Sequence, residues 1–454
     1  MSSDMPKINR ILIAGTGSGC GKTTVTCAVL QALKNRGLDI GAAKCGPDYI
    51  DPMFHRTVIG AASGNLDPFF FDENTLRFLL AKNAAGRDLT VIEGVMGYYD
   101  GLSLTTSRAG AYEVARITDT PVILTVNAKG ASLSILAQIK GFLDFVPQSF
   151  IRGVILNNCT EKVYTALAPL IESTLGVQPL GFMPNLPQCE IGSRHLGLVT
   201  AAEIADIQTK MQALAAEAEK SLDIDGIITL SADAPALSCR SVTTERREGV
   251  RIAVSRDKAF CFYYEDSLSR LTDIGAELVP FSPLADNHLP ENIHGLFLCG
   301  GYPELYAEGL SANQTLRQDI LHALENGLPC IAECGGFMYL TEAIAGYPMV
   351  GFIPGSCSDK GRLTRFGYVT LTAERDNMLC KKGESIPAHE FHHWDADFPG
   401  EDFTARKPDG REWACVHAGD TLYAGFPHFH FYANDAFTNG FYNACLKEKH
   451  RCSR

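Results

Sequence analysis

The segment that decides the fold is ILIAGTGSGCGKTT, residues 11–24. Its first four residues form an apolar run that predicts a buried strand, and a glycine-rich loop and a helix-forming segment follow directly. This order of strand, loop and helix is typical of sites where backbone N–H groups and a helix N-terminus bind a phosphate chain. Lys22 can add a positive charge beside the β- and γ-phosphates, and the Thr23 hydroxyl can bind Mg²⁺.

The loop departs from the usual phosphate-binding spacing at one position. The common pattern has a glycine at position 16, where this chain has Thr16, and Gly15 comes one residue earlier. Because the strand, the helix and the Gly-Lys-Thr-Thr end of the motif are intact, a nucleotide site is a better interpretation than a glycine-rich turn that binds nothing. The residues of this loop expected to contact ATP are Thr16, Gly17, Gly19, Gly21, Lys22, Thr23 and Thr24.

Acidic residues follow the early strands. Glu93 comes directly after an apolar run, and Asp48 and Asp51 lie in a loop behind another predicted strand. Asp100 lies in a further loop. Since ligands bind at the carboxyl ends of parallel strands, we expect these carboxylates near the phosphate loop, where their oxygens suit Mg²⁺.

The pattern of the whole chain predicts an α/β fold with two domains. Apolar runs alternate with helical patterns in the first half, which indicates a parallel sheet covered on both faces. The predicted strands are residues 11–14, 89–92, 122–126 and 154–156, and the predicted helices are residues 23–35, 132–142 and 163–175. Residues 233–249 lack a periodic apolar pattern and indicate a linker. We therefore expect a phosphate-loop domain with a doubly wound parallel sheet at residues 1–232, and a second α/β domain at residues 250–454 with strands at residues 251–254, 296–298 and 330–332.

Composition excludes several classes of partner. The 454 residues carry a formal net charge of −12, which argues against a nucleic-acid-binding surface. No apolar stretch approaches the roughly 20 residues needed to span a bilayer, and no signal peptide precedes the first strand, so we expect no membrane association. The fifteen cysteines are scattered without a Cys-x-x-Cys pair, which favours a location in the reducing cytoplasm.

A second motif, CIAECGG at residues 330–336, predicts a buried strand that turns sharply into a helix. Cys334 lies at the turn, where its side chain would be exposed, and the N–H of Gly335 is then available to bind an oxyanion. A helix N-terminus also lowers the pKa of a thiol. Gly301, in the GGYPE segment that follows an earlier strand, is a second candidate oxyanion donor. Cys334 is therefore a candidate nucleophile.

The base for this thiol is expected in AGFPHFHF, residues 424–431. His428 and His430 are two residues apart, so on a strand they would share a face, although only one can reach Cys334. By contrast, HEFHH at residues 389–393 only formally matches the H-E-x-x-H zinc motif, which works on a helix. Its proline and aromatic neighbours favour a strand, where the outer histidines would lie about 13 Å apart, so we expect no zinc site.

With these motifs in place, the chain resembles the cobyrinate a,c-diamide synthases, a family of corrinoid-pathway glutamine amidotransferases, along its whole length. The phosphate loop also resembles that of dethiobiotin synthetase, which has the same longer glycine spacing. The matching motifs are KCGPDYIDP (44–52), EGVMGYYDG (93–101), RHLGL (194–198), GGYPE (300–304), AECGG (332–336) and HEFH (389–392).

The resemblance implies an ATP-binding amide synthetase domain followed by a class I glutaminase-like domain. ATP would phosphorylate a carboxylate of cobyrinate or a related tetrapyrrole, and ammonia from L-glutamine would displace the phosphate, which amidates the a and c acetates in turn. A homodimer is compatible with this resemblance. The implied roles are Mg²⁺ binding by Thr23, Asp48 and Glu93, adenine recognition by Asn157, tetrapyrrole binding by Tyr49, Ile50 and Asp100, and glutaminase catalysis by Cys334 and His428.

Two positions depart from related patterns. Class I glutaminases usually carry a glutamate two residues beyond the catalytic histidine, where this chain has His430. The resemblance therefore implies a Cys334–His428 dyad with a weakly oriented histidine, and His428, rather than His430, aligns with the catalytic position. Tyr98 stands where the family commonly has an aliphatic residue.

Three other families remain as alternatives. Nickel-sirohydrochlorin a,c-diamide synthases perform the same chemistry on another macrocycle, and the sequence separates them poorly from this family. Cobyric acid synthase amidates four other carboxylates, but residues 46–52 and the His-x-His spacing favour the a,c enzyme. Partition and septum-site ATPases resemble the first half, yet they have no glutaminase, and the Cys334 motif argues against a protein-binding switch.

Overall fold

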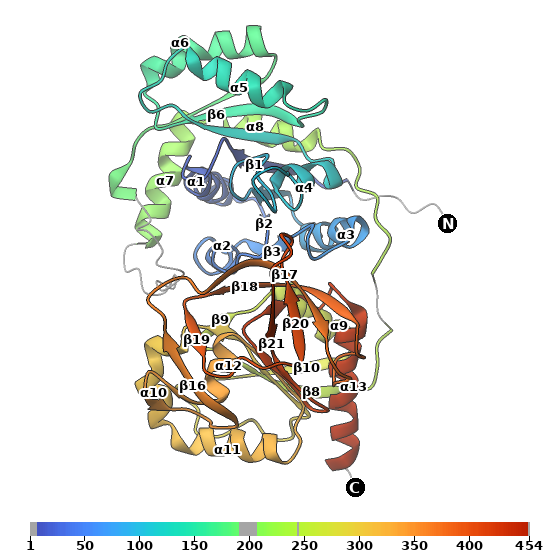
Figure 1. Cartoon of the computed structure of the whole chain (residues 1–454). Helices are drawn as coiled ribbons and strands as arrows, with labels where there is room; N and C mark the ends of the chain where they lie inside the picture. The colour runs from blue at the N-terminus through green and yellow to red at the C-terminus, as the bar shows by residue number, and fades with distance from the viewer. Residues whose placement is uncertain (1–6, 190–206, 243–244, 453–454) are drawn as a thin grey trace. The chain divides into compact units, whose positions relative to one another are not determined.

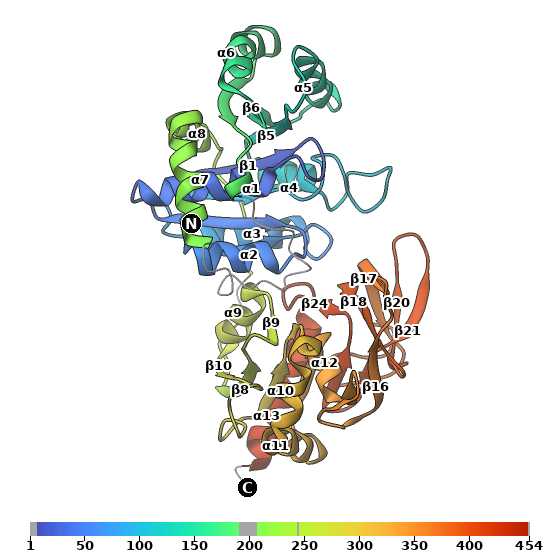
Figure 2. The same cartoon turned by 90° about the vertical axis from the view of Figure 1, so that its left-hand side faces the viewer.

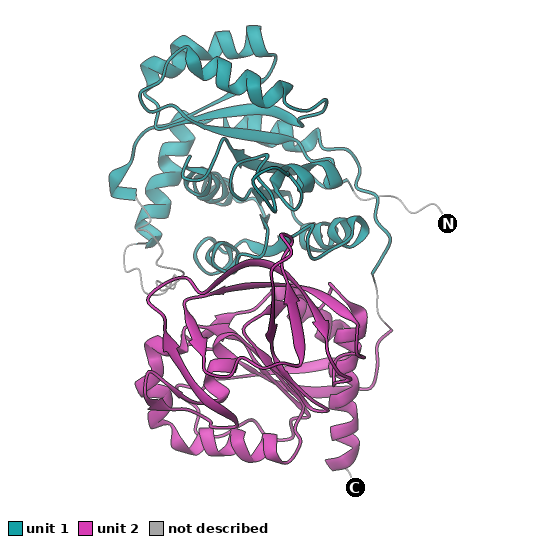
Figure 3. Cartoon of the chain, in the orientation of Figure 1, with its two compact units in different colours: residues 1–242 teal, residues 243–454 magenta. Residues whose placement is uncertain are grey.

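The computed structural model describes residues 7–189, 207–242 and 245–452. The chain forms two compact units, Met1–Val242 and Thr243–Arg454 (Figure 3). Helix α8 (Ile224–Ala232) is the last element of the first unit, and strand β8 (Val250–Ser255) is the first element of the second. The RHLGL motif at residues 194–198 lies outside the described residues.

The first unit is built on a seven-stranded sheet in the order β3-β2-β4-β1-β5-β6-β7, in which every neighbouring pair is parallel (Figure 1). Its strands are β1 (Arg10–Gly15), β2 (Ile40–Cys45), β3 (Ala62–Leu66), β4 (Leu89–Glu93), β5 (Val122–Asn127), β6 (Ile151–Asn157) and β7 (Gln178–Met183). The order of connection reverses at β1, and ligands bind at such a switch point in open α/β sheets. The phosphate loop follows β1 at this point.

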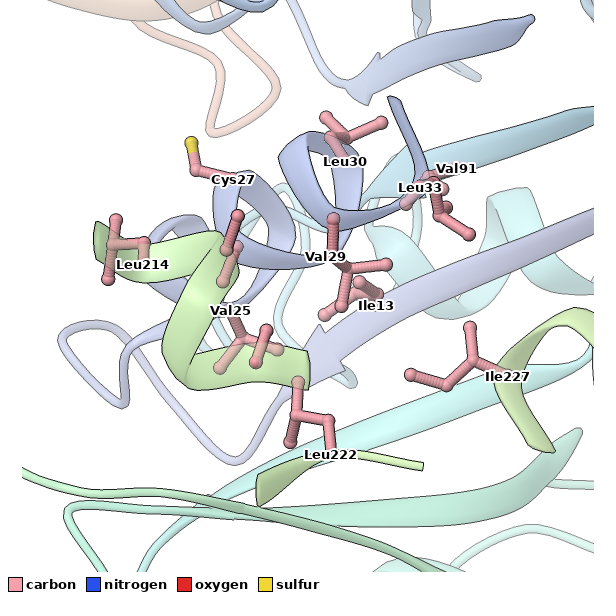
Figure 4. Packing of buried hydrophobic residues seen from close by; sticks show 14 of the residues in the cluster. Ile13, Val25, Cys27, Val29, Leu30, Leu33, Val91, Leu214, Leu222 and Ile227 are labelled. Carbon is pink, nitrogen blue, oxygen red and sulfur yellow. The ribbon is translucent and has the colours of Figure 1, made fainter. Parts of the chain in front are cut away.

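Helices cover both faces of this sheet (Figures 1 and 2). Helices α1 (Lys22–Asn35), α7 (Ile207–Ser221) and α8 pack on one face, and α3 (Glu73–Ala84) and α4 (Ala111–Thr118) lie on the other. Figure 4 shows Ile13 and Val91 from the strands in one buried cluster with Val25 of α1 and Leu214 of α7. Each buried side chain of this kind stabilises the fold by about 1.5–3 kcal/mol, so the packing holds α1 firmly beneath the loop. The remaining helices are α2 (Ile50–Phe54), α5 (Ser134–Asp144) and α6 (Glu161–Leu170).

The second unit contains a six-stranded sheet in the order β10-β8-β11-β13-β23-β22, parallel except for β22. Its further strands are β10 (Ala276–Phe281), β11 (Gly295–Leu298), β13 (Cys330–Glu333), β22 (His417–Ala418) and β23 (Leu422–Gly425). The helices of this unit are α9 (Glu265–Ile274), α10 (Ala307–Ala312), α11 (Gln314–Glu325), α12 (Gly335–Leu340) and α13 (Asp435–Cys452). Strand β13 ends at the carboxyl edge of the parallel sheet, next to Gly425 of β23.

Smaller sheets complete the second unit. Their orders are β21-β20-β17-β18-β24, β15-β14-β16-β19 and β12-β9. The strands are β9 (Phe260–Phe262), β12 (Gly300–Gly301), β14 (Thr341–Ile344), β15 (Tyr347–Pro348), β16 (Ile353–Asp359), β17 (Arg365–Ala373), β18 (Ser385–His392), β19 (Trp394–Ala396), β20 (Phe403–Arg406), β21 (Glu412–Cys415) and β24 (His428–Phe429). The HEFH segment therefore lies on a strand, as predicted, and not on a helix.

Most of the predicted elements are confirmed. The seven apolar runs correspond to β1, β4, β5, β6, β8, β11 and β13, and two of the helices correspond to α1 and α5. The third predicted helix is shorter than expected, because α6 contains Pro169 and gives way to a π-helical turn at Ile171–Leu175. Within the described residues, no helix is both long and apolar enough to cross a membrane.

Candidate active sites

The phosphate loop is held by contacts from both of its sides. Lys22, the first residue of α1, donates from Nζ to the Gly17 carbonyl at 2.9 Å. Asn157, the last residue of β6, donates from Nδ2 to the Cys20 carbonyl at 2.9 Å. Gly21 has φ +97°, and a Cβ at this position would lie 1.9 Å from Asn157 Nδ2. Only glycine fits at position 21, so steric crowding by Asn157 explains this glycine of the Gly-Lys-Thr-Thr segment.

The EGVMGYYDG segment packs directly against this loop. The Tyr98 N–H donates to the Gly15 carbonyl at 2.8 Å, and Asp100 accepts from the Gly97 N–H at 2.8 Å. Burial lowers the pKa of Lys22 below its ordinary value, although Asp100 and Glu93 act in the opposite direction. The Tyr98 side chain is fully buried and donates from its hydroxyl to the Ser149 carbonyl at 2.6 Å. This unusual tyrosine is therefore a core residue that anchors the segment, and it does not line the site.

Side chains from strand β2, from helices α1 and α2, and from the π-helical turn that follows α2 come together around Glu93, the last residue of β4. The Thr23 hydroxyl donates to Glu93 Oε1 at 2.6 Å, and Lys44 Nζ lies 3.0 Å from the same oxygen. Lys44 also lies 2.7 Å from Asp51 Oδ2, and His55 Nε2 lies 3.2 Å from Glu93 Oε2. Lys44 and His55 were not predicted as site residues. Lys44 begins the KCG stretch and His55 lies three residues after the DYIDP segment, but no spacing rule links either one to a carboxylate at residue 93.

Burial and charge set the protonation of this cluster. Burial and Asp51 raise the pKa of Asp48 to about 7. Burial also acts to raise the pKa of Glu93, but Lys44 and His55 outweigh it and hold this pKa below the ordinary value. Burial lowers the pKa of Lys44, yet the surrounding carboxylates outweigh burial and raise it. The cluster therefore holds two buried carboxylates, Asp51 and Glu93, and Lys44 lies within ion-pair distance of both.

These residues fit a magnesium site of the kind that is completed by a nucleotide. Thr23 and Glu93 present two oxygen atoms within 2.6 Å of each other, and Asp48 adds a half-buried carboxylate that a cation would help to ionise. No group of three or more His, Cys, Asp or Glu side chains in the described residues is arranged to hold a metal by itself. Mg²⁺ usually takes one or two carboxylates together with waters and substrate phosphates, and Thr23, Asp48 and Glu93 offer oxygen atoms of that kind.

The other predicted site residues lie at the start of α2. Tyr49 is the residue before this helix, and Ile50 is its first residue. The Ile50 N–H donates to Asp48 Oδ1 at 2.8 Å, and Asn65 Nδ2 donates to the Asp48 carbonyl at 2.8 Å. This loop is therefore fixed from β3, and it presents Tyr49 and Ile50 next to the acidic cluster.

Cys334 has the strained backbone expected of a nucleophile at a sharp turn. It lies between β13 and α12 with φ +48° and ψ −103°, a region that non-glycine residues rarely adopt. Its N–H donates to the Gly425 carbonyl at 2.7 Å, which fixes the turn against β23. Gly335 begins α12, and a Cβ on Gly335 would lie 3.0 Å from the Gly301 nitrogen. The structure thus brings the thiol and both predicted oxyanion donors together.

His428 is held between Cys334 and a buried carboxylate. Its side chain hydrogen-bonds Cys334, and its Nδ1 lies 3.1 Å from Oε2 of Glu333. Burial lowers the pKa of His428, but these two hydrogen bonds outweigh burial and raise it to about 10. The expectation of a weakly oriented histidine is therefore wrong, because Glu333 contacts the ring nitrogen that faces away from the thiol.

His430 is placed differently from the prediction. Strand β24 ends at Phe429, so His430 does not share a strand face with His428. Its Nδ1 accepts from the Tyr432 N–H at 3.1 Å, and its ring packs against Tyr264 at 4.9 Å between centroids. Burial lowers the pKa of His430 to about 3, so it is neutral near pH 7. Its observed contacts are those of a packed core residue.

Comparison with known proteins agrees with this division into two sites. Residues 11–199 match the CobQ/CobB/MinD/ParA nucleotide binding domain, which supports ATP as the nucleotide, and residues 251–436 match the CobB/CobQ-like glutamine amidotransferase domain. A cobyrinate a,c-diamide synthase from Caldanaerobacter subterraneus is 37% identical over 443 residues, covering 96% of this chain and 98% of the relative. The chain belongs to the cobyrinate a,c-diamide synthase family. Other members are similarly close, with 38% identity in Thermoplasma volcanium over 97% of this chain and 98% of the relative, and 38% in Listeria monocytogenes over 94% and 97%.

Membership of the cobyrinate a,c-diamide synthase family makes this chain a glutamine-dependent amidotransferase of the ligase class. The two matched domains coincide with the two clusters of site residues, since the phosphate loop lies in the first and Cys334 lies in the second. The family relationship was predicted correctly from the motifs. Glu333 lies inside one of those motifs, AECGG, but its contact with His428 joins residues 95 positions apart and has no sequence signal.

Proposed function

We propose that this chain amidates the a and c acetate carboxylates of cobyrinate, or of the related hydrogenobyrinate, with ATP and L-glutamine as co-substrates. The observation that carries the proposal is the presence, on one chain, of an acidic phosphate-loop site and a Cys334–His428 pair. Full-length relatives at 37–38% identity are named for this reaction. A cytoplasmic location and a homodimer stay predictions.

In the first unit, the γ-phosphate of ATP is transferred to a substrate carboxylate, and ammonia then displaces phosphate to leave a primary amide. The phosphate loop from Thr16 to Thr24 holds the triphosphate, with Lys22 countering charge on the β- and γ-phosphates. Mg²⁺ held by Thr23, Asp48 and Glu93 supplies positive charge against the phosphates when it is bound. Tyr49, Ile50 and Asp100 bind the tetrapyrrole, and Asn157 binds adenine.

In the second unit, Cys334 attacks the side-chain amide of glutamine, and ammonia leaves from the resulting tetrahedral intermediate. The N–H groups of Gly301 and Gly335 stabilise the oxyanion, because they are fixed before the charge develops. His428 takes the thiol proton and passes it to the leaving ammonia. Water then hydrolyses the thioester and releases glutamate.

The substrate is tested by incubating the protein with ATP, glutamine and either cobyrinate or nickel-sirohydrochlorin. Mass spectrometry should find a diamide from cobyrinate, formed with the higher kcat/KM, because the full-length relatives at 37–38% identity are named cobyrinate a,c-diamide synthase. Omission of ATP is the control and should leave both macrocycles unchanged. A higher kcat/KM for nickel-sirohydrochlorin would assign the chain to the alternative reaction, and no amidation of either would refute the proposal.

A further inference from the structure

Glu333 is a buried carboxylate whose two oxygens both contact the segment that carries His428. It is the last residue of β13 and lies immediately before Cys334. Its Oε2 lies 3.1 Å from His428 Nδ1, and its Oε1 accepts from the Phe429 N–H at 3.2 Å. Only about 3–4% of the side chains of Glu333 and His428 is exposed, so water does not compete for these contacts.

The contacts of His428 fix which ring nitrogen faces the thiol. A carboxylate can only accept a hydrogen bond, so Nδ1 carries a proton and donates it to Glu333. The hydrogen bond to Cys334 therefore uses Nε2. Gly300 leaves room for this arrangement, because a Cβ there would lie 2.5 Å from His428 Cε1 and 3.3 Å from Nε2. The ring is held in one orientation by neighbours on three sides.

Other titratable side chains near His428 do not replace this carboxylate. His389 lies opposite His428 in the pairing of β18 with β24, and burial lowers the pKa of His389 to about 3, so it is neutral. His430 uses Nδ1 to accept from Tyr432 and is also neutral. Glu390 follows His389 directly on β18, so the two side chains point to opposite faces of the strand. Burial raises the pKa of Glu390 to about 7. Glu333 is the carboxylate whose oxygen lies within hydrogen-bond distance of the His428 ring.

We propose that Glu333 is the positioning residue of the glutaminase site, which turns the Cys334–His428 pair into a three-member arrangement. It takes the role of the glutamate that related glutaminases carry two residues beyond the histidine. In this chain, however, the carboxylate belongs to the residue directly before the nucleophile. This inference rests on the glutaminase role proposed above.

The charge of Glu333 acts at two moments of the reaction. While the sulfur bonds to the amide carbon, the carboxylate stabilises the imidazolium whose Nε2 holds the proton that Cys334 has given up. When the C–N bond breaks, the Nε2 proton leaves with the nitrogen as ammonia, and Nδ1 keeps its own proton because Glu333 holds it. A side chain that donates to Nδ1 instead would place the remaining proton on Nε2, where it cannot accept the thiol proton.

The decisive variant is Glu333→Gln, which keeps an oxygen to accept the Phe429 N–H but loses the charge and can donate to Nδ1. We expect kcat for glutamine hydrolysis to fall by about 10²–10⁴-fold, with KM little changed. Ammonia-dependent synthesis should be retained. Glu333→Asp should recover part of kcat, and Glu448→Gln, which alters a buried carboxylate paired with Arg451 in the same unit, should match the unaltered protein.

Selective ¹⁵N labelling of histidine gives a readout that a purely structural role would not move. The His428 signals are assigned by their loss in His428→Ala, and their pH dependence reports the ring pKa. Glu333 favours the protonated ring and so raises the pKa of His428, which is about 10 in the folded protein. The His428 imidazolium therefore persists up to that pH in the unaltered protein. In Glu333→Gln, the imidazolium should lose its proton at a lower pH.

An unchanged His428 pKa together with near-normal glutamine hydrolysis in Glu333→Gln would overturn the inference. Equal loss of ammonia-dependent synthesis would overturn it too, because it would indicate a structural role for Glu333. If Glu333→Gln does not fold, Glu333→Asp decides the question, and an unchanged kcat in that variant counts against the inference. Failure of the unaltered protein to hydrolyse glutamine would instead refute the proposed function.

Discussion

A Cys334→Ser variant is expected to lose glutamine-dependent amide formation by at least about 10³-fold while it keeps ammonia-dependent synthesis. The thiolate serves only to release ammonia, and a serine hydroxyl at this position lacks the acidity to replace it. The strained backbone of residue 334 accommodates serine without added bulk, so the fold should be retained. The measurement compares initial rates of amide formation with saturating glutamine and with ammonium chloride.

Cys452→Ser is the matched control for this variant. It removes an exposed thiol at the end of α13, and both rates should equal those of the unaltered protein. Equal loss of both nitrogen sources in Cys334→Ser would contradict the assignment of ammonia release to the second unit. Unchanged use of glutamine would remove Cys334 from the mechanism.

Lys22→Ala and Glu93→Gln are each expected to abolish amide formation with either nitrogen source. Lys22 lies beside the loop that binds the phosphates, and Glu93 is the centre of the acidic cluster with Thr23 and Lys44. Loss of one such electrostatic contact typically costs about 10²–10³-fold in kcat. ATP hydrolysis and amide formation are measured in parallel, and both should fall together because phosphate transfer precedes attack by ammonia.

Lys34→Ala is the control for Lys22→Ala, because Lys34 lies near the other end of α1 and donates to the Gly60 carbonyl. It should leave both rates unchanged. Glutamine hydrolysis without acceptor should persist in Lys22→Ala, since this reaction uses the second unit alone. Full ammonia-dependent turnover in either Lys22→Ala or Glu93→Gln would refute the assignment of the nucleotide site.

The parallel sheets were predictable and the antiparallel sheets were not, for a physical reason. Strands β1 and β4 are buried on both faces, so their sequences are continuous apolar runs. Strand β17 is only partly buried and carries polar residues at alternate positions, and β18 was predicted as a strand only at residues 389–393, without its partners. Such strands do not stand out from loops, and their pairing depends on residues far away in the chain. The sheet that carries His428 was therefore missed.

In the candidate sites, too, local features were predicted and contacts between distant residues were not. Cys334 and Gly335 were predicted because a nucleophile turn is a local feature of strand, turn and helix. Lys44, His55 and Glu333 were missed because their contacts join residues that are far apart in the chain. The choice of His428 rather than His430 as the base stays a prediction, but the conclusion that His428 lacks an orienting partner was wrong. A missing glutamate at one position of a motif did not exclude a carboxylate from another strand.

The most direct test of the account follows the nitrogen atom. The protein is incubated with cobyrinate, ATP and glutamine labelled with ¹⁵N in its side-chain amide, in the presence of unlabelled ammonium, and the product is analysed by mass spectrometry. The account predicts that the unaltered protein forms an a,c-diamide enriched in ¹⁵N at both new amides, and that Cys334→Ser forms the same diamide without label. Label in the product of Cys334→Ser, or an unlabelled diamide from the unaltered protein in the same mixture, would contradict it.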